Sequence, residues 1–310
     1  MISAARVSVV IVNWNNFADT SECLDSLRRA SYPNFEVVLV DNASTGDDAR
    51  LIREGYGDFV RLIENSSNEG FAEGCNIGMK DALGRGADYI VLLNNDTVAA
   101  PDFLDRIIPV MEADRRIGIA GGMVYSYEAP ELIWFGGGRI NYRTGNTPIR
   151  GSAERDVGQY SGIADVDWIC GCYMVLSRET LDKAGLLDRR FFFGWEDADI
   201  SVRAARAGFR VVFVPDSRIW HKTFSEVKQD RLMGMPVYYA TRGHFIFMEK
   251  HFTRFQLCTA GLYFIVSFPR FLRDYTRILG RRKVPLYIFM DIYGYLTRRW
   301  RQWSRVPQER

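Results

Sequence analysis

Short apolar runs alternate with amphipathic stretches along the first 120 residues of the chain. Each run is five or six residues long and most are rich in Val, Ile and Leu, which is typical of strands that are buried on both faces of a parallel sheet. The stretches between them, such as Thr20–Arg29, have one apolar face and predict helices that cover this sheet. The predicted strands are Val7–Val12, Glu36–Val40, Phe59–Ile63, Tyr89–Leu93 and Ile117–Gly122.

The pattern changes in the second part of the chain. The glycine-rich, polar stretch Gly136–Gly162 predicts a mobile loop or hairpin, whereas Val166–Ser177 predicts a central strand. Gly194–Gly208 predicts a helix that ends at a glycine, and Arg210–Val214 predicts the last strand. Beyond about residue 231 the sequence is helical, aromatic and basic. We therefore predict an α/β domain over residues 1–230, with a mostly parallel sheet flanked by helices, and a helical C-terminal region over residues 231–310.

The composition supports a large core and excludes several classes of protein. Of the 310 residues, 47% are hydrophobic, so we expect neither disorder nor a disulfide scaffold. The number of cysteines is odd and the closest pair has the spacing C-G-C, so we expect reduced thiols and no structural zinc. The longest apolar stretch, Leu257–Phe268, is shorter than the ~18 residues that a membrane-spanning helix needs. Together with an amino terminus unlike a signal peptide, these features predict a cytoplasmic chain.

Charge is unevenly distributed along the chain. Residues 231–310 contain 15 Lys and Arg against 4 Asp and Glu, a net charge of +11, whereas the preceding residues have a net charge of −9. Basic helices that also carry Trp300 and Trp303 suit an anionic membrane, so we expect peripheral attachment to the inner face of the cytoplasmic membrane. Packing on the first domain and an oligomer contact are the alternatives, and the oligomeric state stays open. The acidic first part and the absence of recognition motifs argue against nucleic-acid binding.

Four polar loops follow predicted strands. They are rich in Asn, Asp and Gly, and they are Asn13–Asn16, Asp41–Thr45, Asn68–Gly78 and Asn94–Thr97. Ligands of open α/β sheets bind beyond the carboxyl ends of the strands. These loops are therefore the first candidates for a binding site.

The loop Asn94-Asn95-Asp96 places a single carboxylate at the tip of an apolar strand. One aspartate is enough for Mg²⁺ if the ligand brings a diphosphate, because this cation takes one or two protein carboxylates and completes its shell with water and phosphate. Asn94 and Asn95 would then bond ribose or phosphate without adding charge. A polar turn that simply ends the strand is an equally good explanation of this loop alone.

The other loops offer nucleotide contacts. Asp41 could accept a hydrogen bond from a base or a ribose, and Trp14 could stack on a nucleobase, although a single tryptophan is more often a core residue. Gly70, Gly74 and Gly78 are four residues apart and would line one face of a helix, which permits close approach of a ligand or close packing on the sheet. The loops contain neither a P-loop nor a G-x-G-x-x-G sequence.

An acidic cluster occupies a predicted helix start. Glu196, Asp197 and Asp199 could simply complement the helix dipole, or one of them could be a general base. Paired carboxylates also occur in glycosidases, but a glycosidase leaves the four polar loops unexplained. His221, after the last predicted strand, could bind a metal or a diphosphate, and a structural histidine is the alternative.

Five stretches between residues 7 and 221 have the order and spacing of a known family. They are "VSVVIVNWN", "VVLVDNAS", "NEGFAEGCNIGM", "YIVLLNNDT" and "CGCYMVLSRETLDKAGLLDRRFFFGWEDADISVRAARAGFRVVFVPDSRIWH". With them the chain resembles glycosyltransferase family 2, the inverting nucleotide-sugar enzymes of the GT-A fold, and in particular its rhamnosyltransferase-like bacterial branch. The resemblance implies a GT-A fold over residues 1–230 and transfer of a sugar from a nucleoside diphosphate to a hydroxyl group, with Mg²⁺ or Mn²⁺ as cofactor.

The resemblance also implies roles for individual residues in donor binding. Trp14 and Asp41 would hold the base and ribose of the donor, and the loop Asn68–Gly78 would lie along the nucleotide. The residues implied to bind the nucleotide sugar are Val12, Asn13, Trp14, Asn15, Asp41, Asn42, Asn68, Gly70, Phe71, Gly74, Asn76, Asn94, Asn95, Asp96 and Trp195.

The remaining implied roles concern the metal and the chemistry. Asp96 and His221 would bind the metal, and the pair Glu196-Asp197 would be the catalytic acidic motif with Asp197 as the base. Asn94 stands where the family's metal motif has its first acidic residue. This departure puts the strength of metal binding in question.

Two other functions are compared with glycosyl transfer. A catalytically inactive protein that binds nucleotide sugars, or serves as a scaffold, would also explain the missing first aspartate. A sugar-phosphate nucleotidylyltransferase would need a G-x-G-x-R-type loop, which Val12–Asn16 does not supply. For an active enzyme, dTDP-rhamnose is the donor that the resemblance favours and UDP-hexoses are alternatives. The acceptor would be lipid-linked or a polysaccharide of the cell envelope.

Overall fold

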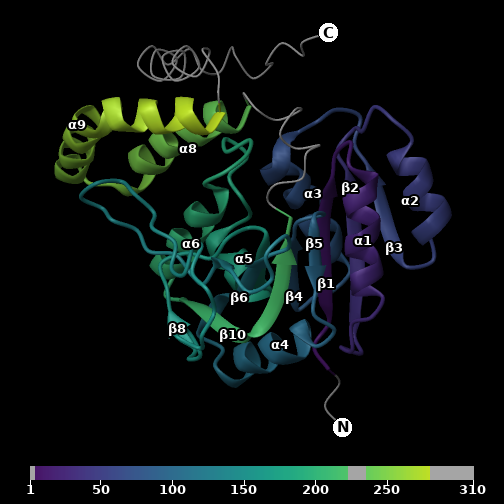
Figure 1. Cartoon of the computed structure of the whole chain (residues 1–310). Helices are drawn as coiled ribbons and strands as arrows, with labels where there is room; N and C mark the ends of the chain where they lie inside the picture. Colours follow the sequence, from purple (N-terminus) through teal and green to yellow (C-terminus); the bar gives the residue numbers. More distant parts are fainter. Residues whose placement is uncertain (1–3, 223–234, 280–310) are drawn as a thin grey trace. The chain divides into compact units, whose positions relative to one another are not determined.

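The computed structural model describes residues 4–222 and 235–279, which belong to two compact units (Figure 1). Unit 1 contains Met1–Ile140, Thr147–Phe192 and Glu196–Phe224, and unit 2 contains Asn141–Asn146, Phe193–Trp195 and the residues from Ser225 onward. The domain boundary expected near residue 230 falls outside the described residues. It stays a prediction.

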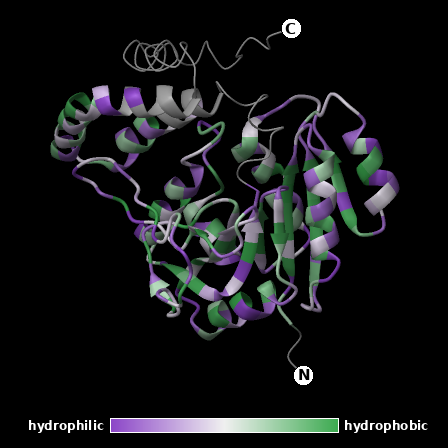
Figure 2. Cartoon of the chain, in the orientation of Figure 1, coloured by the Kyte–Doolittle hydropathy of each residue, from purple (hydrophilic) through white to green (hydrophobic). Residues whose placement is uncertain are grey.

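Within the described residues, the strands of unit 1 form a ten-stranded mixed sheet with the order β3-β2-β1-β4-β9-β6-β10-β5, with β7 beside β6 and β8 beside β10. The first four strands of this order pair in parallel, as the short apolar runs predict. Figure 2 shows that these strands are strongly hydrophobic. The strands are β1 (Val7–Asn13), β2 (Phe35–Asp41), β3 (Val60–Glu64), β4 (Tyr89–Leu93), β5 (Thr97–Ala99), β6 (Ile117–Ser126), β7 (Ile133–Phe135), β8 (Ala164–Asp165), β9 (Tyr173–Ser177) and β10 (Arg210–His221).

The strand predicted over Val166–Ser177 is shorter than expected. It forms only as β9, which runs antiparallel to both β4 and β6. The preceding residues leave the sheet because the backbone of Trp168 pairs with that of Gly138 in an earlier loop. Since Tyr173 is opposite Leu93, the start of β9 lies at the edge where β4 ends.

Strand β10 is longer than predicted. It continues past Val214 to His221, and an irregularity in its pairing with β6 between Val214 and Arg218 accommodates Pro215, which cannot donate a backbone hydrogen bond. The extension pairs His221 with Thr97 of β5. It therefore places His221 beside the loop that follows β4.

Helices cover both faces of the sheet (Figure 1). The helices of unit 1 are α1 (Phe17–Leu27), α2 (Asp48–Tyr56), α3 (Gly70–Gly84), α4 (Phe103–Ala113), α5 (Arg178–Ala184) and α6 (Glu196–Arg206). Side chains alternate along β1, so Asn13 meets Thr20 of α1 on one face, and Val10 meets Gly78 of α3 on the other.

Unit 2 is helical in its described part, as its sequence predicts. It contains α8 (Met235–His251) and α9 (Arg254–Leu279), and its aromatic rings pair, as in Tyr142 with Phe252 at 5.1 Å between centroids. Among the described residues, no helix combines the length and apolar character needed to cross a membrane. The basic segment with Trp300 and Trp303 lies outside the described residues.

Candidate active site

The side chains at the carboxyl ends of β1 and β2 form a buried hydrogen-bond network. Nδ2 of Asn13 donates to Oδ1 of Asp41 at 2.8 Å and to Oγ of Ser44 at 3.2 Å. The hydroxyl and the backbone N–H of Ser44 also donate to the Asp41 carboxylate, at 2.6 and 3.0 Å. Asn13 and Asp41 are almost fully buried, so these bonds replace the water that the carboxylate loses. They fix Asp41 at the edge where the parallel strands end.

The tip of β4 joins this network and adds a carboxylate–histidine pair. Nδ2 of Asn95 donates to Oγ1 of Thr20 at 2.8 Å, and the Thr20 hydroxyl donates to Oδ1 of Asn13 at 2.8 Å. Next along the chain, Asp96 is buried with Oδ1 3.1 Å from Nε2 of His221. Burial lowers the pKa of His221, so its imidazole is neutral at pH 7. A neutral imidazole beside a carboxylate is able to bind a cation.

Asp96, Asn94 and His221 fit a partial site for a divalent cation. Oδ1 of Asn94 and Nδ1 of His221 are buried and have no hydrogen-bond partner within the described part of the chain. No group of three or more His, Cys, Asp and Glu side chains in residues 4–222 and 235–279 is arranged to hold a metal. A cation here would use Asp96 and His221 and take its other ligands from water and phosphate, which is a common arrangement for Mg²⁺.

The loop between β3 and α3 is held by Asn42. Its Nδ2 donates to Oδ1 of Asn68 at 2.9 Å and to the carbonyl of Gly70 at 3.1 Å. Its Oδ1 accepts from Nδ2 of Asn65 at 2.9 Å and from the N–H of Glu69 at 3.1 Å. The polar atoms of this side chain are thus engaged within the protein. Asn42 shapes the start of the segment Asn68–Gly78, which is expected to lie along a nucleotide and of which the part from Gly70 onward belongs to α3.

The glycines of α3 permit close packing on the sheet. A Cβ atom at Gly78 would lie 2.5 Å from Cγ1 of Val10, and one at Gly74 would lie 3.1 Å from Cγ1 of Val12. Both distances are shorter than ordinary van der Waals contacts. Close packing of α3 on the sheet therefore explains the glycines at positions 74 and 78. The side chain of Val12, another residue expected to contact the nucleotide sugar, faces this helix.

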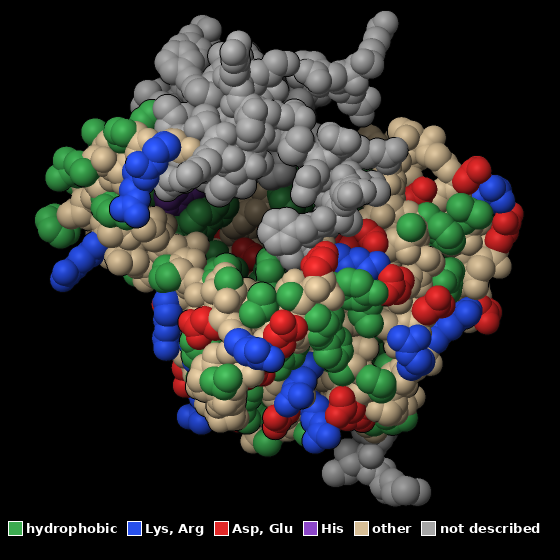
Figure 3. All heavy atoms as spheres, viewed as in Figure 1, with side chains coloured by type: hydrophobic (Ala, Val, Ile, Leu, Met, Phe, Trp, Pro, Cys, Tyr) green, Lys and Arg blue, Asp and Glu red, His purple; other side chains and the backbone are tan. Residues whose placement is uncertain are grey.

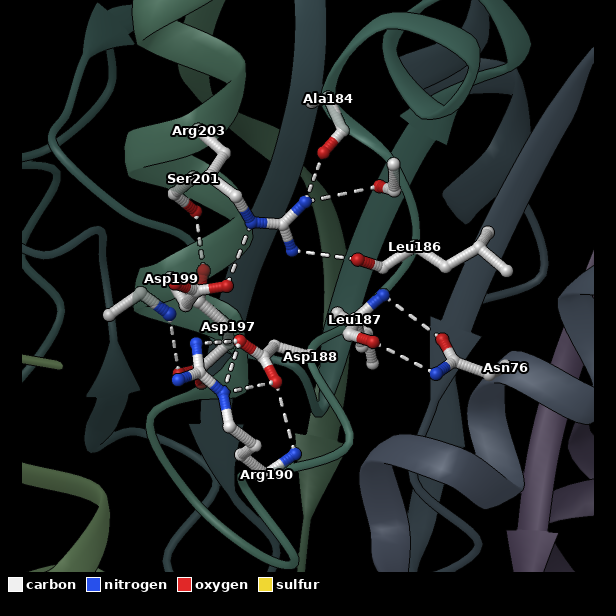
Figure 4. A network of polar contacts seen from close by, with 12 residues as sticks. Asn76, Ala184, Leu186, Leu187, Asp188, Arg190, Asp197, Asp199, Ser201 and Arg203 are labelled. Carbon is white, nitrogen blue, oxygen red and sulfur yellow. Dashed lines mark hydrogen bonds and ion pairs between the residues drawn. The ribbon is translucent and has the colours of Figure 1, made fainter. Parts of the chain in front are cut away.

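Two contacts attach α3 to the loop before α6. The N–H of Phe71, which follows Gly70 at φ +84°, donates to the carbonyl of Phe192 at 2.7 Å. The buried amide of Asn76 exchanges two hydrogen bonds with the backbone of Leu187, at 2.9 and 3.0 Å (Figure 4). Asn76 was expected among the nucleotide contacts, but both of its polar atoms are used in this attachment.

The acidic residues at the start of α6 occupy different environments. Glu196 and Asp199 are buried, whereas Asp197 is half-buried. Asp199 forms an ion pair with Arg203 at 2.8 Å, and Arg203 also donates to three consecutive carbonyls that end at Leu186 (Figure 4). Asp199 therefore has a structural role. Asp197 is the most accessible of the three carboxylates.

The Asp197 carboxylate is oriented by the backbone. Its Oδ2 accepts from the N–H of Gly171 at 3.0 Å and its Oδ1 accepts from the N–H of Ala198 at 2.7 Å. Burial nevertheless raises the pKa of Asp197 above its ordinary value. A carboxylate whose ionised form is disfavoured in this way binds a proton more readily, as a general base must.

A short series of contacts connects Asp197 with His221. Gly171, which donates to Asp197, is followed by Cys172, whose carbonyl accepts from the N–H of Asn94 at 3.1 Å. Nδ2 of Asn94 in turn lies 3.3 Å from Nε2 of His221. The tips of β1, β2 and β4, the end of β10 and the start of α6 thus share one edge of unit 1.

The remaining residues expected to contact the nucleotide sugar include Trp14, Asn15 and Trp195. Trp14 is half-buried. Asn15, at φ +52°, accepts from the N–H of Thr45 at 2.7 Å through Oδ1 and so links the loops after β1 and β2. Trp195 belongs to unit 2 and is described with that unit below.

One residue beside the site has no counterpart in the sequence analysis. The N–H of Lys222 donates to the carbonyl of Asp96 at 2.9 Å, and its ammonium group pairs with Asp19 at 2.8 Å and with Glu22. The sequence signal that could have identified Lys222 as a residue beside the site is its position directly after His221. Its partners on α1 are about 200 residues away in the sequence, and no local pattern predicts them.

Known proteins share the family and the fold of this chain. The family described as "Glycosyltransferase like family 2" matches residues 4–231. The N-acetylglucosaminyl-diphospho-decaprenol L-rhamnosyltransferase of Mycobacterium tuberculosis (strain ATCC 25618 / H37Rv) is 25% identical over 240 residues, which are 69% of this chain and 75% of that protein. Matches to two other relatives, from Bacillus subtilis and Haemophilus influenzae, cover only 44% and 36% of those proteins.

Solved structures share the fold. GalNAc-T7 with UDP, GalNAc and Mn²⁺ has a TM-score of 0.68 at 16% identity, covering 96% of this chain and 58% of that one. The mannosyltransferase PcManGT of Pyrobaculum calidifontis, with GDP-Man and Mn²⁺, has a TM-score of 0.59 at 17% identity, covering 98% and 89%. These similarities confirm the GT-A fold that the sequence predicts. With the family match over most of its length, the chain belongs to glycosyltransferase family 2.

Proposed function

We propose that the chain is an inverting glycosyltransferase that moves a sugar from a nucleoside diphosphate to a hydroxyl group of an acceptor. One observation carries the proposal: the network around Asp41, the Asp96–His221 pair and the accessible Asp197 share the edge where the strands of unit 1 end. Open α/β sheets bind their ligands at this edge. The three features supply a donor site, a place for the leaving diphosphate and a base.

In this proposal the donor nucleotide binds over the tips of β1 and β2. Asp41, held rigid by Asn13 and Ser44, accepts a hydrogen bond from the base or the ribose. The ring of Trp14, which is half-buried, stacks on the base. The loop that Asn42 shapes borders the nucleotide through its backbone, since the amide of Asn42 itself is engaged.

Asp197 acts as the base. As the acceptor hydroxyl attacks the anomeric carbon, its proton passes to the Asp197 carboxylate, and the bond from that carbon to the diphosphate oxygen breaks on the opposite face. The electron pair leaves with the nucleoside diphosphate, so configuration inverts and no covalent enzyme intermediate forms. The N–H groups of Gly171 and Ala198 hold the carboxylate in place for this transfer.

Asp96 and His221 would hold Mg²⁺ or Mn²⁺ beside the diphosphate. A bound cation would neutralise the charge that develops on the leaving group. Because Asn94 replaces one carboxylate of the family motif, we expect a weaker metal site than two aspartates would give.

For the substrates, the proposal favours L-rhamnose from dTDP-rhamnose and a lipid-linked or polysaccharide acceptor of the cell envelope. The support is the similarity to the mycobacterial protein named as a rhamnosyltransferase that acts on a lipid diphosphate. A UDP-hexose is the alternative donor. A thermal-shift screen of nucleotide sugars with and without Mn²⁺ would identify the donor.

We also propose peripheral attachment to an anionic membrane through α9. Four large apolar side chains are exposed at spacings that place them on one face of this helix, and they are Phe255, Leu262, Ile265 and Val266. Phe255 and Val266 are 76% and 73% exposed, which is unusual for such residues. Arg254, Arg270 and Arg273 on the same helix are exposed too, and Figure 3 shows apolar and basic side chains together where α9 lies.

A nucleotide-sugar binding protein without activity is the alternative function. Release of nucleoside diphosphate distinguishes an active transferase from an inactive binding protein. The acceptors in this assay are polyprenyl diphosphate sugars or oligosaccharides. An active transferase releases it at a substantial rate only when donor and acceptor are both present. Donor binding with no release in any acceptor mixture would favour the inactive protein.

A further inference from the structure

Unit 2 contains a strained residue, Trp195, two positions before the proposed base. Trp195 has a φ angle of +75°, and the preceding Gly194 has a φ of +84°. A bulky residue rarely adopts this left-handed conformation, because its Cβ then clashes with its own backbone. Surrounding contacts must therefore hold Trp195 in place.

Helix α8 supplies these contacts. The Trp195 ring stacks on His244 with centroids 4.6 Å apart and planes only 6° from parallel, and it also meets Phe247 at 5.2 Å. A Cβ atom at Gly243 would lie 2.7 Å from Cδ1 of Trp195 and 3.0 Å from the carbonyl of Gly194. Only a glycine at position 243 therefore lets the loop approach α8 this closely.

His244 is itself anchored. Its Nε2 lies 2.9 Å from the carbonyl oxygen of Gly145, which can only accept, so this nitrogen carries the hydrogen and donates it. Burial lowers the pKa of His244 to about 4, so the ring is neutral at pH 7 and stacks without a charge to desolvate. The ring is thus fixed on one side by Gly145 and presents its face to Trp195.

We propose that His244 is a positioning residue that holds Trp195 and thereby sets the first turn of α6, which begins at the next residue, Glu196, and carries Asp197. This inference rests on the proposed role of Asp197 as the base. It assigns α8 a function in catalysis, although no residue of α8 is required to touch the substrate. A shift of the loop would move the Asp197 carboxylate relative to the acceptor hydroxyl, and small displacements of a base have large effects on rate.

Two substitutions at His244 distinguish its stacking on Trp195 from its hydrogen bond to Gly145. His244→Phe keeps an aromatic ring for stacking and loses the hydrogen bond to Gly145, and His244→Leu loses both. Phe264→Leu is the matched control, because it removes a ring of unit 2 that pairs with Phe245 and Phe268 and does not meet Trp195. Trp195 is observed by ¹⁹F NMR of the 5-fluorotryptophan protein, in which Trp195→Phe identifies its resonance among the seven tryptophans.

We expect His244→Leu to shift the Trp195 resonance and to lower kcat about tenfold with the donor KM within about twofold of wild type. His244→Phe should restore most of kcat, and Phe264→Leu should change neither quantity. An unshifted resonance in His244→Leu, or a shifted resonance with wild-type kcat, would overturn the inference. An inactive wild-type chain would instead contradict the proposed function and the catalytic part of the inference, while the resonance would still decide whether His244 holds Trp195.

Discussion

The Nε2 atom of His221 lies 3.1 Å from the Oδ1 atom of Asp96, and both side chains are buried. The two atoms come from the end of β10 and from the turn after β4, and both are able to accept a hydrogen bond or bind a cation. Two acceptors this close repel each other unless a hydrogen or a cation lies between them. In the tautomer whose hydrogen is on Nδ1, the lone pair of Nε2 faces the carboxylate, and a divalent cation bound to both atoms would remove their repulsion. This is the physical basis of the first prediction.

Asp96→Ala and His221→Ala should each weaken the binding of a nucleoside diphosphate about tenfold or more in the presence of Mn²⁺. In EDTA the variants and the wild type should bind the nucleoside diphosphate with similar, weak affinity. The substitutions weaken binding by removing the cation site, and EDTA removes the cation itself. Isothermal titration calorimetry measures both conditions. Asp102→Ala, which removes an exposed carboxylate paired with Arg106, is the control for the change in charge. Equal losses with Mn²⁺ and with EDTA would show that the pair does not act through a metal.

The pH dependence of the reaction should show the environment of Asp197. A base works only when it is deprotonated, and burial raises the pKa of Asp197 above its ordinary value. We therefore expect kcat/KM to be constant near neutral pH and to fall toward acid pH with an apparent pKa above that of an exposed aspartate. Stopped assays between pH 4 and pH 8, with stability checked at each pH, would measure this. An acid limb at the ordinary carboxyl value would contradict the environment that we describe.

Gly78→Ala should destabilise the protein by about 1–3 kcal/mol, because the new methyl group would overlap with Val10 in a packed core. Gly84→Ala on the same helix is the matched control: its Cβ would meet no atom within 4 Å, and alanine favours a helix by up to about 1 kcal/mol. Urea denaturation measures both free energies of unfolding. If both variants had the same stability, close packing of α3 on the sheet would not explain the glycine.

Replacing Leu262 and Ile265 by aspartate should reduce binding to vesicles of phosphatidylglycerol and phosphatidylcholine by about tenfold or more, since each apolar side chain is worth roughly 1.5–3 kcal/mol when buried. Val157→Asp with Ile163→Asp is the matched control, because these side chains are also exposed and apolar but belong to unit 1. Cosedimentation at low salt measures binding. Equal binding of the two double variants would remove α9 as the membrane contact.

Much of the architecture follows from local sequence. The strands from β1 to β4 are predicted because each is a short apolar run with polar loops at its end, and a strand buried on both faces has this pattern in any protein. The same logic explains why Asp41 and Asp96 could be predicted as site candidates: parallel strands bring their carboxyl ends to one edge.

Other features depend on contacts that no local pattern encodes. The run Val166–Ser177 is mostly apolar over its whole length, so neither its direction in the sheet nor the departure of its first half was predictable. Lys222 pairs with acidic residues of α1, and His244 stacks on Trp195. Both contacts join residues far apart in the sequence and form only through tertiary packing. Asn42 and Asn76 show a further limit: the sequence places them near the site, but it does not reveal that their amides hold backbone in place.

The most direct test of the central claim is the rate of sugar transfer by Asp197→Asn. The substitution keeps the size of the side chain and an acceptor for one of the two N–H groups, but it removes the ability to take a proton. We predict that transfer from the donor to the acceptor falls by about 100-fold or more while the donor Kd stays within about twofold. Transfer at the wild-type rate would contradict the account.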